Sequence, residues 1–213
     1  ATLGAVAAIS SVPVGSLVTR VTLRPPPVTA GLATTLRAIC GNQAILGLGV
    51  GDRLSEDEAL RYGMERPGLS ERIEVLETTI SLIRQNTPDL QVWVGGRHPR
   101  IREVAARLAD GWNAWGATPD EFASEAAGVL AQSHRDLTIS WGGGILLAAS
   151  SEALTQEVAN RGNSEGVIAG TPERVATRLA EIAAVADRMV VSVLPNRPAN
   201  WELFTTEVLG RLT

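Results

Sequence analysis

Residues 92–100 read VWVGGRHPR, and they carry the strongest signal for the fold in this sequence. An apolar run typical of a buried strand ends on the pair Gly95-Gly96. Pro99 suits the first position of a helix, so the pattern predicts a strand, a glycine turn and a helix. Glycines allow close approach of the backbone to a ligand, and a helix N-terminus attracts anions. The turn therefore indicates a phosphate site, with a tight turn bearing solvated arginines as the simpler alternative.

Outward from this stretch, strand and helix patterns alternate along the chain. The strands are near-continuous apolar runs, which is typical of a parallel sheet covered on both faces. Alternating units of this kind predict an α/β protein with a parallel sheet. The predicted strands are 12–19, 44–50, 90–94, 111–116, 137–150 (interrupted by glycines) and 188–194. The predicted helices are 26–39, 70–85 (with Ser70 as N-cap), one from Pro99, one from Thr118-Pro119, 171–185 and 201–212.

Two architectures fit six strand–helix units: an open doubly wound sheet and a (β/α)8 barrel. The barrel is favoured because nearly every strand ends in glycines or polar residues, and barrels collect their chemistry at that end. A full barrel has eight units in about 250 residues. The chain starts at Ala1 with TLGAVAAIS, which has the pattern of a helix end. We therefore expect residues 1–213 to form a single barrel domain whose first two units lie upstream.

Composition excludes several classes of function. The chain is 45% hydrophobic and carries a net charge of −4 without a basic stripe, which argues against a nucleic-acid partner. No apolar run reaches transmembrane length, and the lone Cys40 offers no internal disulfide. His98 and His134 are too few and too far apart for a metal cluster. We expect a cytoplasmic protein with no metal and no membrane or nucleic-acid partner.

Other glycine-rich stretches carry weaker signals. ILGLGVGD (45–52) has the spacing G-x-G-x-G and lacks the dinucleotide fingerprint, so we expect its glycines to let a flat ligand lie across the strand end. Asp52 follows that end, where a carboxylate can transfer a proton, the alternative being a turn aspartate. Gly15 indicates either a bulge or ordinary packing. In ADGWNAWG (109–116), core packing of the tryptophans is favoured over ligand stacking.

Taken in order, these segments resemble the luciferase-like monooxygenases, and most of all their F420-dependent oxidoreductase branch. The most specific segment is QVWVGGRHPRIREVAARLADGWN (91–113). The other matching segments are LVTRVTLRPP (17–26), ILGLGVGD (45–52), SERIEVLE (70–77) and GTPERVATRL (170–179). The resemblance implies a (β/α)8 TIM barrel of bacterial-luciferase type with about six of its eight units in this chain, and a homodimer.

The resemblance also implies a cofactor and its contacts. Coenzyme F420, or alternatively FMN, would lie across the barrel mouth, with Gly95 and Gly96 giving backbone N–H groups to its phosphate. A non-prolyl cis peptide is expected at Leu17-Val18, behind the cofactor ring. The other expected contacts are Gly15, Gly49, Arg97 and Arg100, with Asp52 as the acidic residue of the site. The resemblance further implies that the histidine which relatives often use would lie on a strand upstream of this sequence.

Three functions follow from this resemblance. The first is hydride transfer between F420 and a small organic substrate. The second is a monooxygenase that uses reduced FMN and oxygen. The third is a non-catalytic flavin-binding relative with an incomplete barrel. An unrelated parallel α/β protein, which would bind neither cofactor, is the remaining alternative.

Overall fold

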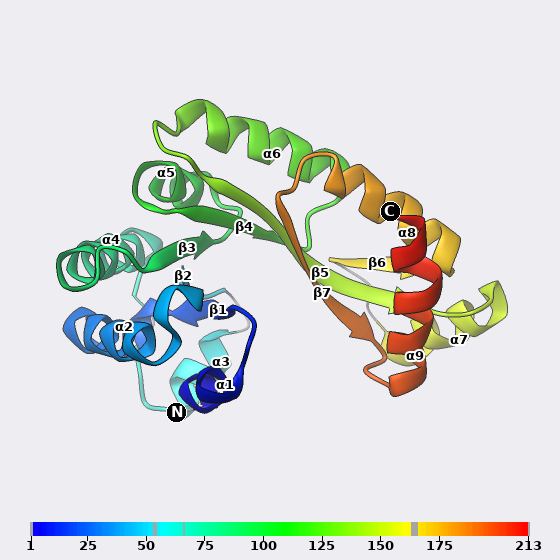
Figure 1. Cartoon of the computed structure of the whole chain (residues 1–213), viewed down its shortest axis with the longest axis horizontal. Helices are drawn as coiled ribbons and strands as arrows, with labels where there is room; N and C mark the ends of the chain where they lie inside the picture. Colours follow the sequence, from blue (N-terminus) through cyan, green and yellow to red (C-terminus); the bar gives the residue numbers. More distant parts are fainter. Residues whose placement is uncertain (1, 53–54, 66, 163–165, 213) are drawn as a thin grey trace. The chain divides into compact units, whose positions relative to one another are not determined.

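The computed structural model describes residues 2–52, 55–65, 67–162 and 166–212 (Figure 1). Parallel strands and helices alternate through these ranges, as the apolar patterning predicts. The chain divides into two compact units. The first unit holds Ala1–Trp112 with Gln132–Leu137, and the second holds Asn113–Ala131 with Thr138–Thr213. The division falls within β4 (Gly111–Trp115).

The first unit is a parallel sheet in which β2 lies between β1 and β3. Its helices α2 and α4 lie side by side (Figure 1). Its strands are β1 (Val14–Arg20), β2 (Ala44–Gly49) and β3 (Gln91–Gly95). Its helices are α1 (Thr2–Ile9), α2 (Pro26–Cys40), α3 (Ser55–Arg61), α4 (Leu69–Asn86) and α5 (Pro99–Leu108), with 3-10 turns at Val21–Leu23 and Gly41–Gln43.

The apolar stripe of α4 explains why this helix forms where the sequence predicts it. The predicted inward residues Ile73, Leu76, Ile80 and Ile83 are all buried. Each fully buried aliphatic side chain of this size contributes about 1.5–3 kcal/mol relative to exposure. Packing of this stripe therefore outweighs the weak capping, because the N-cap is Gly68 and no side chain caps the helix. The prediction of Ser70 as the N-cap was wrong.

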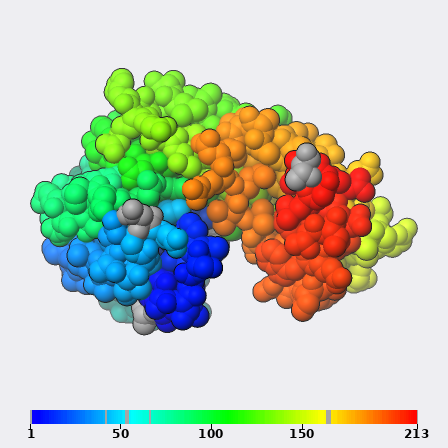
Figure 2. Space-filling view, viewed as in Figure 1, coloured from blue at the N-terminus to red at the C-terminus, as the bar shows by residue number. Residues whose placement is uncertain are grey.

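The second unit is centred on β5 (Thr138–Leu147), which pairs in parallel with β6 and with β7. Figure 2 shows the red C-terminal segment lying against the orange region that includes α8, and the two are in contact. The further strands are β6 (Val167–Gly170) and β7 (Arg188–Leu194). The helices are α6 (Pro119–Gln132), α7 (Ser151–Arg161), α8 (Pro172–Ala183) and α9 (Pro198–Leu203), followed by a π-turn at Phe204–Val208 and a 3-10 turn at Leu209–Arg211.

The structure corrects several local predictions. β5 is one continuous strand, and its glycines do not interrupt it. The space that their side chains would take is occupied by the indole rings of Trp115 and Trp141 at Gly142 and Gly143, and by Leu194 and Val167 at Gly144. Sequence patterning missed α3, α7 and β6, which are short or lack a strong apolar stripe. The last helix begins at Pro198, three residues before the predicted Trp201, since proline suits the first helical turn.

Candidate functional site

A bulge in β1 is the most unusual backbone feature of the first unit. The β1–β2 register shifts between Ser16 and Thr19, so β1 carries one extra residue there. The Leu17-Val18 peptide within this bulge is cis and non-prolyl. It lies at the position that the family resemblance implies. The roles of Leu17 and Val18 toward a cofactor stay predictions.

The side chain of Val18 lies over glycines of the two neighbouring strands. A Cβ atom added at Gly49 would lie 2.5 Å from Val18 Cγ2, and one added at Gly95 would lie 2.7 Å from Val18 Cγ1. No side chain fits at either glycine without moving Val18. Val18 itself remains 40% exposed. The glycines at these strand ends therefore make room first for Val18, which presents an apolar surface above them.

The Gly95-Gly96 turn follows β3 and leads into α5. Gly96 has a φ of 141°, a conformation that favours glycine, and a Cβ there would lie 3.1 Å from Ile101 Cγ2. The indole N–H of Trp112 donates to the Gly96 carbonyl at 2.9 Å. A trans peptide places its N–H opposite its C=O, so Trp112 also sets the direction of the Arg97 N–H. The turn is thus held in one orientation by a buried side chain.

The basic residues after this turn differ in their contacts and burial. The backbone N–H of Arg100 donates to Nδ1 of His98, which is the N-cap of α5, at 3.3 Å. The Arg100 guanidinium donates to Ser70 Oγ at 2.9 Å and so ties α5 to the start of α4. Arg97 is half-buried beside the glycine turn. The roles of Arg97 and Arg100 toward a cofactor stay predictions.

Asp52 lies after the end of β2 and is exposed. Its Oδ1 accepts hydrogen bonds from the backbone N–H of Ser55 at 2.9 Å and from Ser55 Oγ at 2.7 Å. Ser55 Oγ in turn lies 3.2 Å from the Asp52 backbone nitrogen, which donates to it. This reciprocal arrangement supports the start of α3. A turn-forming role is thus visible, while proton transfer by Asp52 stays a prediction.

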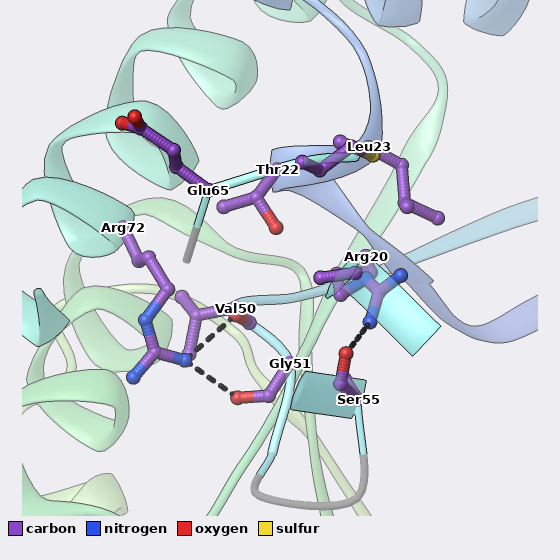
Figure 3. Close-up of a pocket in the computed structure, with 10 residues that line it drawn as sticks. Arg20, Thr22, Leu23, Val50, Gly51, Ser55, Glu65 and Arg72 are labelled. Carbon is purple, nitrogen blue, oxygen red and sulfur yellow. Dashed lines mark hydrogen bonds between the residues drawn. The ribbon is translucent and has the colours of Figure 1, made fainter. Parts of the chain in front are cut away.

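Two arginines that sequence reasoning missed hold the loop that carries Asp52. Arg72 of α4 is buried and donates to the carbonyls of Val50 at 2.9 Å and Gly51 at 2.8 Å (Figure 3). Arg20, at the end of β1, donates to the Ser55 carbonyl at 2.9 Å (Figure 3). They line a cavity of only about 10 Å³, too small for a ligand. The sequence signal for Arg72 was its position beside the apolar stripe of α4.

Gly15 and Asp110 have structural explanations. A Cβ at Gly15 would lie 2.4 Å from the Ile45 carbonyl oxygen, so glycine permits the close approach of β1 and β2. Asp110 accepts from the Val92 backbone N–H at 2.8 Å and pairs with Arg84 at 2.6 Å. A cofactor contact by Gly15 stays a prediction.

The two tryptophans of β4 differ. Trp112 is fully buried, which confirms core packing at that position, whereas Trp115 is 51% exposed. Across the described residues, no three His, Cys, Asp or Glu side chains are grouped as a metal ion would need. None of the helices in the described ranges is long and apolar enough to cross a membrane.

Comparison with known proteins decides the family. The family described as luciferase-like monooxygenase matches residues 1–189 of the 213. The chain belongs to the luciferase-like monooxygenase family. Among curated proteins, a phthiodiolone/phenolphthiodiolone dimycocerosates ketoreductase from Mycobacterium tuberculosis is 32% identical over 123 residues. That match covers 46% of this chain and only 32% of the relative's length.

Several solved structures share the fold across 99% of this chain. The F420-dependent tetrahydromethanopterin reductase from Methanopyrus kandleri superposes with a TM-score of 0.72 at 18% identity and is 86% covered. An F420-dependent secondary alcohol dehydrogenase, in complex with an F420–acetone adduct, gives 0.79 at 13% identity and is 82% covered. The EDTA monooxygenase from Chelativorans sp. BNC1 gives 0.74 at 13% identity and is 75% covered. The predicted luciferase-type TIM-barrel fold class is therefore confirmed.

Proposed function

We propose that this family member is an F420-dependent oxidoreductase that transfers hydride to or from a small organic substrate. The observation that carries the proposal is Val18 lying over Gly49 and Gly95, directly before the Gly95-Gly96 turn. These features provide an apolar surface and a glycine turn in one sheet, as a flat ring with a phosphate tail requires.

The residues fit such a cofactor in two respects. Val18 offers an exposed apolar surface flanked by glycines, where a ring can lie without meeting longer side chains. Gly96 lacks the Cβ that would narrow the turn, and Trp112 fixes the peptide that follows it. Backbone N–H groups held in this way bind phosphate oxygens. Arg97 beside the turn adds the positive charge that a phosphate favours.

When bound, the deazaflavin supplies the hydride chemistry. The chain binds and orients it: Val18 supports the ring, and Gly95, Gly96 and Arg97 hold the phosphate. Asp52, placed by Ser55 after β2, is our candidate for holding or moving a proton. Arg72 contributes indirectly, because it fixes the backbone on the strand side of Asp52.

An equilibrium titration with F420, run beside FMN, tests this proposal through quenching of tryptophan fluorescence. We expect F420 to bind with a Kd on the order of 1 μM or tighter, and more tightly than FMN. A preference for FMN would replace the proposal with an FMN-dependent monooxygenase. Binding of F420 without hydride transfer to any carbonyl substrate would favour a non-catalytic relative.

Two glycine-to-alanine variants, one inside the proposed site and one outside it, serve as test and matched control for this titration. Gly96→Ala places a methyl group 3.1 Å from Ile101 at a φ of 141° and should weaken F420 binding about tenfold. Gly128→Ala adds the same methyl group in α6, where nothing lies within 4 Å, and should leave the affinity unchanged. Equal affinities for the wild type and both variants would remove the Gly95-Gly96 turn from the site.

A further inference from the structure

The second unit contains a cavity that the proposed cofactor site does not use. Its volume is about 510 Å³, within the range of small-molecule sites. It is formed by the start of α6, by β6 and by the first turns of α8, all within the second unit. Gly116 and Gly166 meet at its edge, where a Cβ on Gly116 would lie 3.1 Å from Gly166 Cα.

The cavity combines an apolar wall with two arginines. Val167 and Ile168 of β6 and the buried Trp141 of β5 line the apolar side. Arg174 and Arg178 of α8 line the other side. These arginines are four residues apart, so they project from the same face of the helix. A ligand with a negatively charged head and an apolar body matches this division.

The two guanidinium groups differ in how far their charge is already balanced. Arg178 donates to Glu181 at 2.9 Å, and the nearby Asp120 also faces it. Within the described part of the chain, Arg174 has no hydrogen-bond or ion-pair partner. An incoming anion therefore gains most at Arg174, while Arg178 adds a weaker, partly neutralised charge.

The position of Arg174 is supported by a glycine at the end of β6. A Cβ on Gly170 would lie 3.0 Å from Arg174 Cβ and 3.2 Å from its Cγ. The stem of Arg174 thus packs on the Gly170 backbone, which limits its freedom before any ligand binds. Thr118, by contrast, is engaged with Glu121, since its backbone N–H donates to Oε2 at 2.9 Å. The arginines, rather than the start of α6, are therefore the recognition groups.

We propose that this cavity binds a small organic anion, whose carboxylate or phosphate head pairs with Arg174 and whose apolar body lies against Val167 and Ile168. Arginine forks bind both head groups, so the two share one chemistry. Binding of an anion in this cavity does not require F420 or FMN. This proposal can therefore be tested independently of the proposed function.

Calorimetric titration of the whole chain with phenyl phosphate, benzoate and inorganic phosphate tests the proposal. We expect phenyl phosphate or benzoate to bind with a Kd of about 1 mM or tighter, and inorganic phosphate to bind at least about tenfold more weakly. The tighter of the two aromatic anions identifies the preferred head group. Equal affinity for inorganic and phenyl phosphate would contradict the apolar wall.

Charge-removing variants locate the binding. Arg174→Gln should weaken binding of the preferred anion by about tenfold or more, and Arg178→Gln by less, because Glu181 already neutralises it. Arg211→Gln, an exposed arginine outside the cavity, is the matched control and should change nothing. Gly96→Ala should also leave this affinity unchanged. No binding up to about 20 mM, or equal binding by Arg174→Gln and the wild type, would overturn the proposal.

Discussion

In the first unit, Gly49 and Gly95 make room for the half-exposed Val18, whereas in the second unit Gly143 makes room for the buried Trp141. The geometry is alike: an added Cβ would lie 2.5 Å from Val18 at Gly49 and 2.3 Å from Trp141 at Gly143. The consequences differ because Trp141 is 1% exposed and Val18 is 40% exposed. The same lack of a side chain thus supports a rigid core in one unit and an accessible surface in the other.

Of the substitutions that bring a methyl group against a side chain, Gly143→Ala should have the largest effect on stability. Trp141 is buried and its indole N–H donates to the Ala117 carbonyl at 2.9 Å, so it cannot move away from the new methyl group. We expect a loss of about 3 kcal/mol, at the upper end for overpacked cores. Urea unfolding monitored by circular dichroism measures it. In the same unit, Gly142→Ala meets the half-exposed Trp115 and should cost about 1 kcal/mol. Equal losses would break the argument that burial of the partner decides the cost.

Gly49→Ala should destabilise the protein by about 1–2 kcal/mol, because Val18 can shift toward solvent. The double variant Gly49→Ala, Val18→Ala should recover most of that loss, since the nearest atoms would then be Val18 Cβ and the Gly95 carbonyl oxygen, each at an ordinary contact distance of 3.5 Å. A double-mutant cycle in urea measures this coupling.

Gly47→Ala is the control for that cycle. Its Cβ would lie 2.1 Å from the backbone oxygen of Ser16 and 3.2 Å from Val18 Cγ1. Truncation of Val18 removes only the second, weaker contact and leaves the clash with the backbone oxygen. Val18→Ala should therefore rescue Gly49→Ala and fail to rescue Gly47→Ala. Rescue of both, or of neither, would contradict the direct contact between Val18 and Gly49.

These contacts also show how far sequence reasoning reached. VWVGGRHPR predicted β3, the glycine turn and α5 because strand pattern, glycines and proline are all local signals. Val18 covering Gly95 joins residues far apart in the chain, and neither residue alone indicates it. For the same reason, local reasoning treated the glycines of β5 as an interruption.

Residues that the sequence analysis did not single out were missed for a similar reason. Arg72 follows Glu71 in a helix whose exposed face is charged, so its burial against the Val50 and Gly51 carbonyls depends on tertiary packing. Arg174 was visible only as part of GTPERVATRL. Its relation to a cavity depends on β6, a short strand that patterning missed.

The smallest expected effect concerns exposed carboxyls, one in each unit. Hydrogen bonding from Arg37 holds the pKa of Asp89 below its ordinary value of 3.8. In the second unit, the pKa of Glu152 is lowered mainly by a hydrogen bond from its own backbone N–H. A hydrogen bond from the Ser150 side chain lowers it further. A lowered carboxyl pKa stabilises the fold above the ordinary value, and this stabilisation is lost as pH falls through the folded pKa.

Arg37→Gln should therefore lower Tm slightly at pH 7, and this difference should disappear once the pH falls below the folded pKa of Asp89. About 1 M salt should also reduce it at pH 7, because exposed ion pairs are screened. Ser150→Ala removes a hydroxyl that hydrogen-bonds to the Glu152 carboxyl and accepts from the Ala153 N–H. Because the serine itself is uncharged, the effect of this variant should respond less to salt. Thermal unfolding at several pH and salt values provides the comparison. A salt effect that is larger for Ser150→Ala would contradict this assignment.

We propose above that the glycine-lined strand ends of the first unit hold the cofactor. Amide chemical-shift mapping of this 22.4 kDa chain during addition of F420 tests it most directly. We predict the largest shifts at Val18, Gly49, Gly95, Gly96 and Arg97, with little change at Arg174. Saturable binding whose shifts are concentrated elsewhere, with none at Gly95 or Gly96, would place the cofactor at a different site.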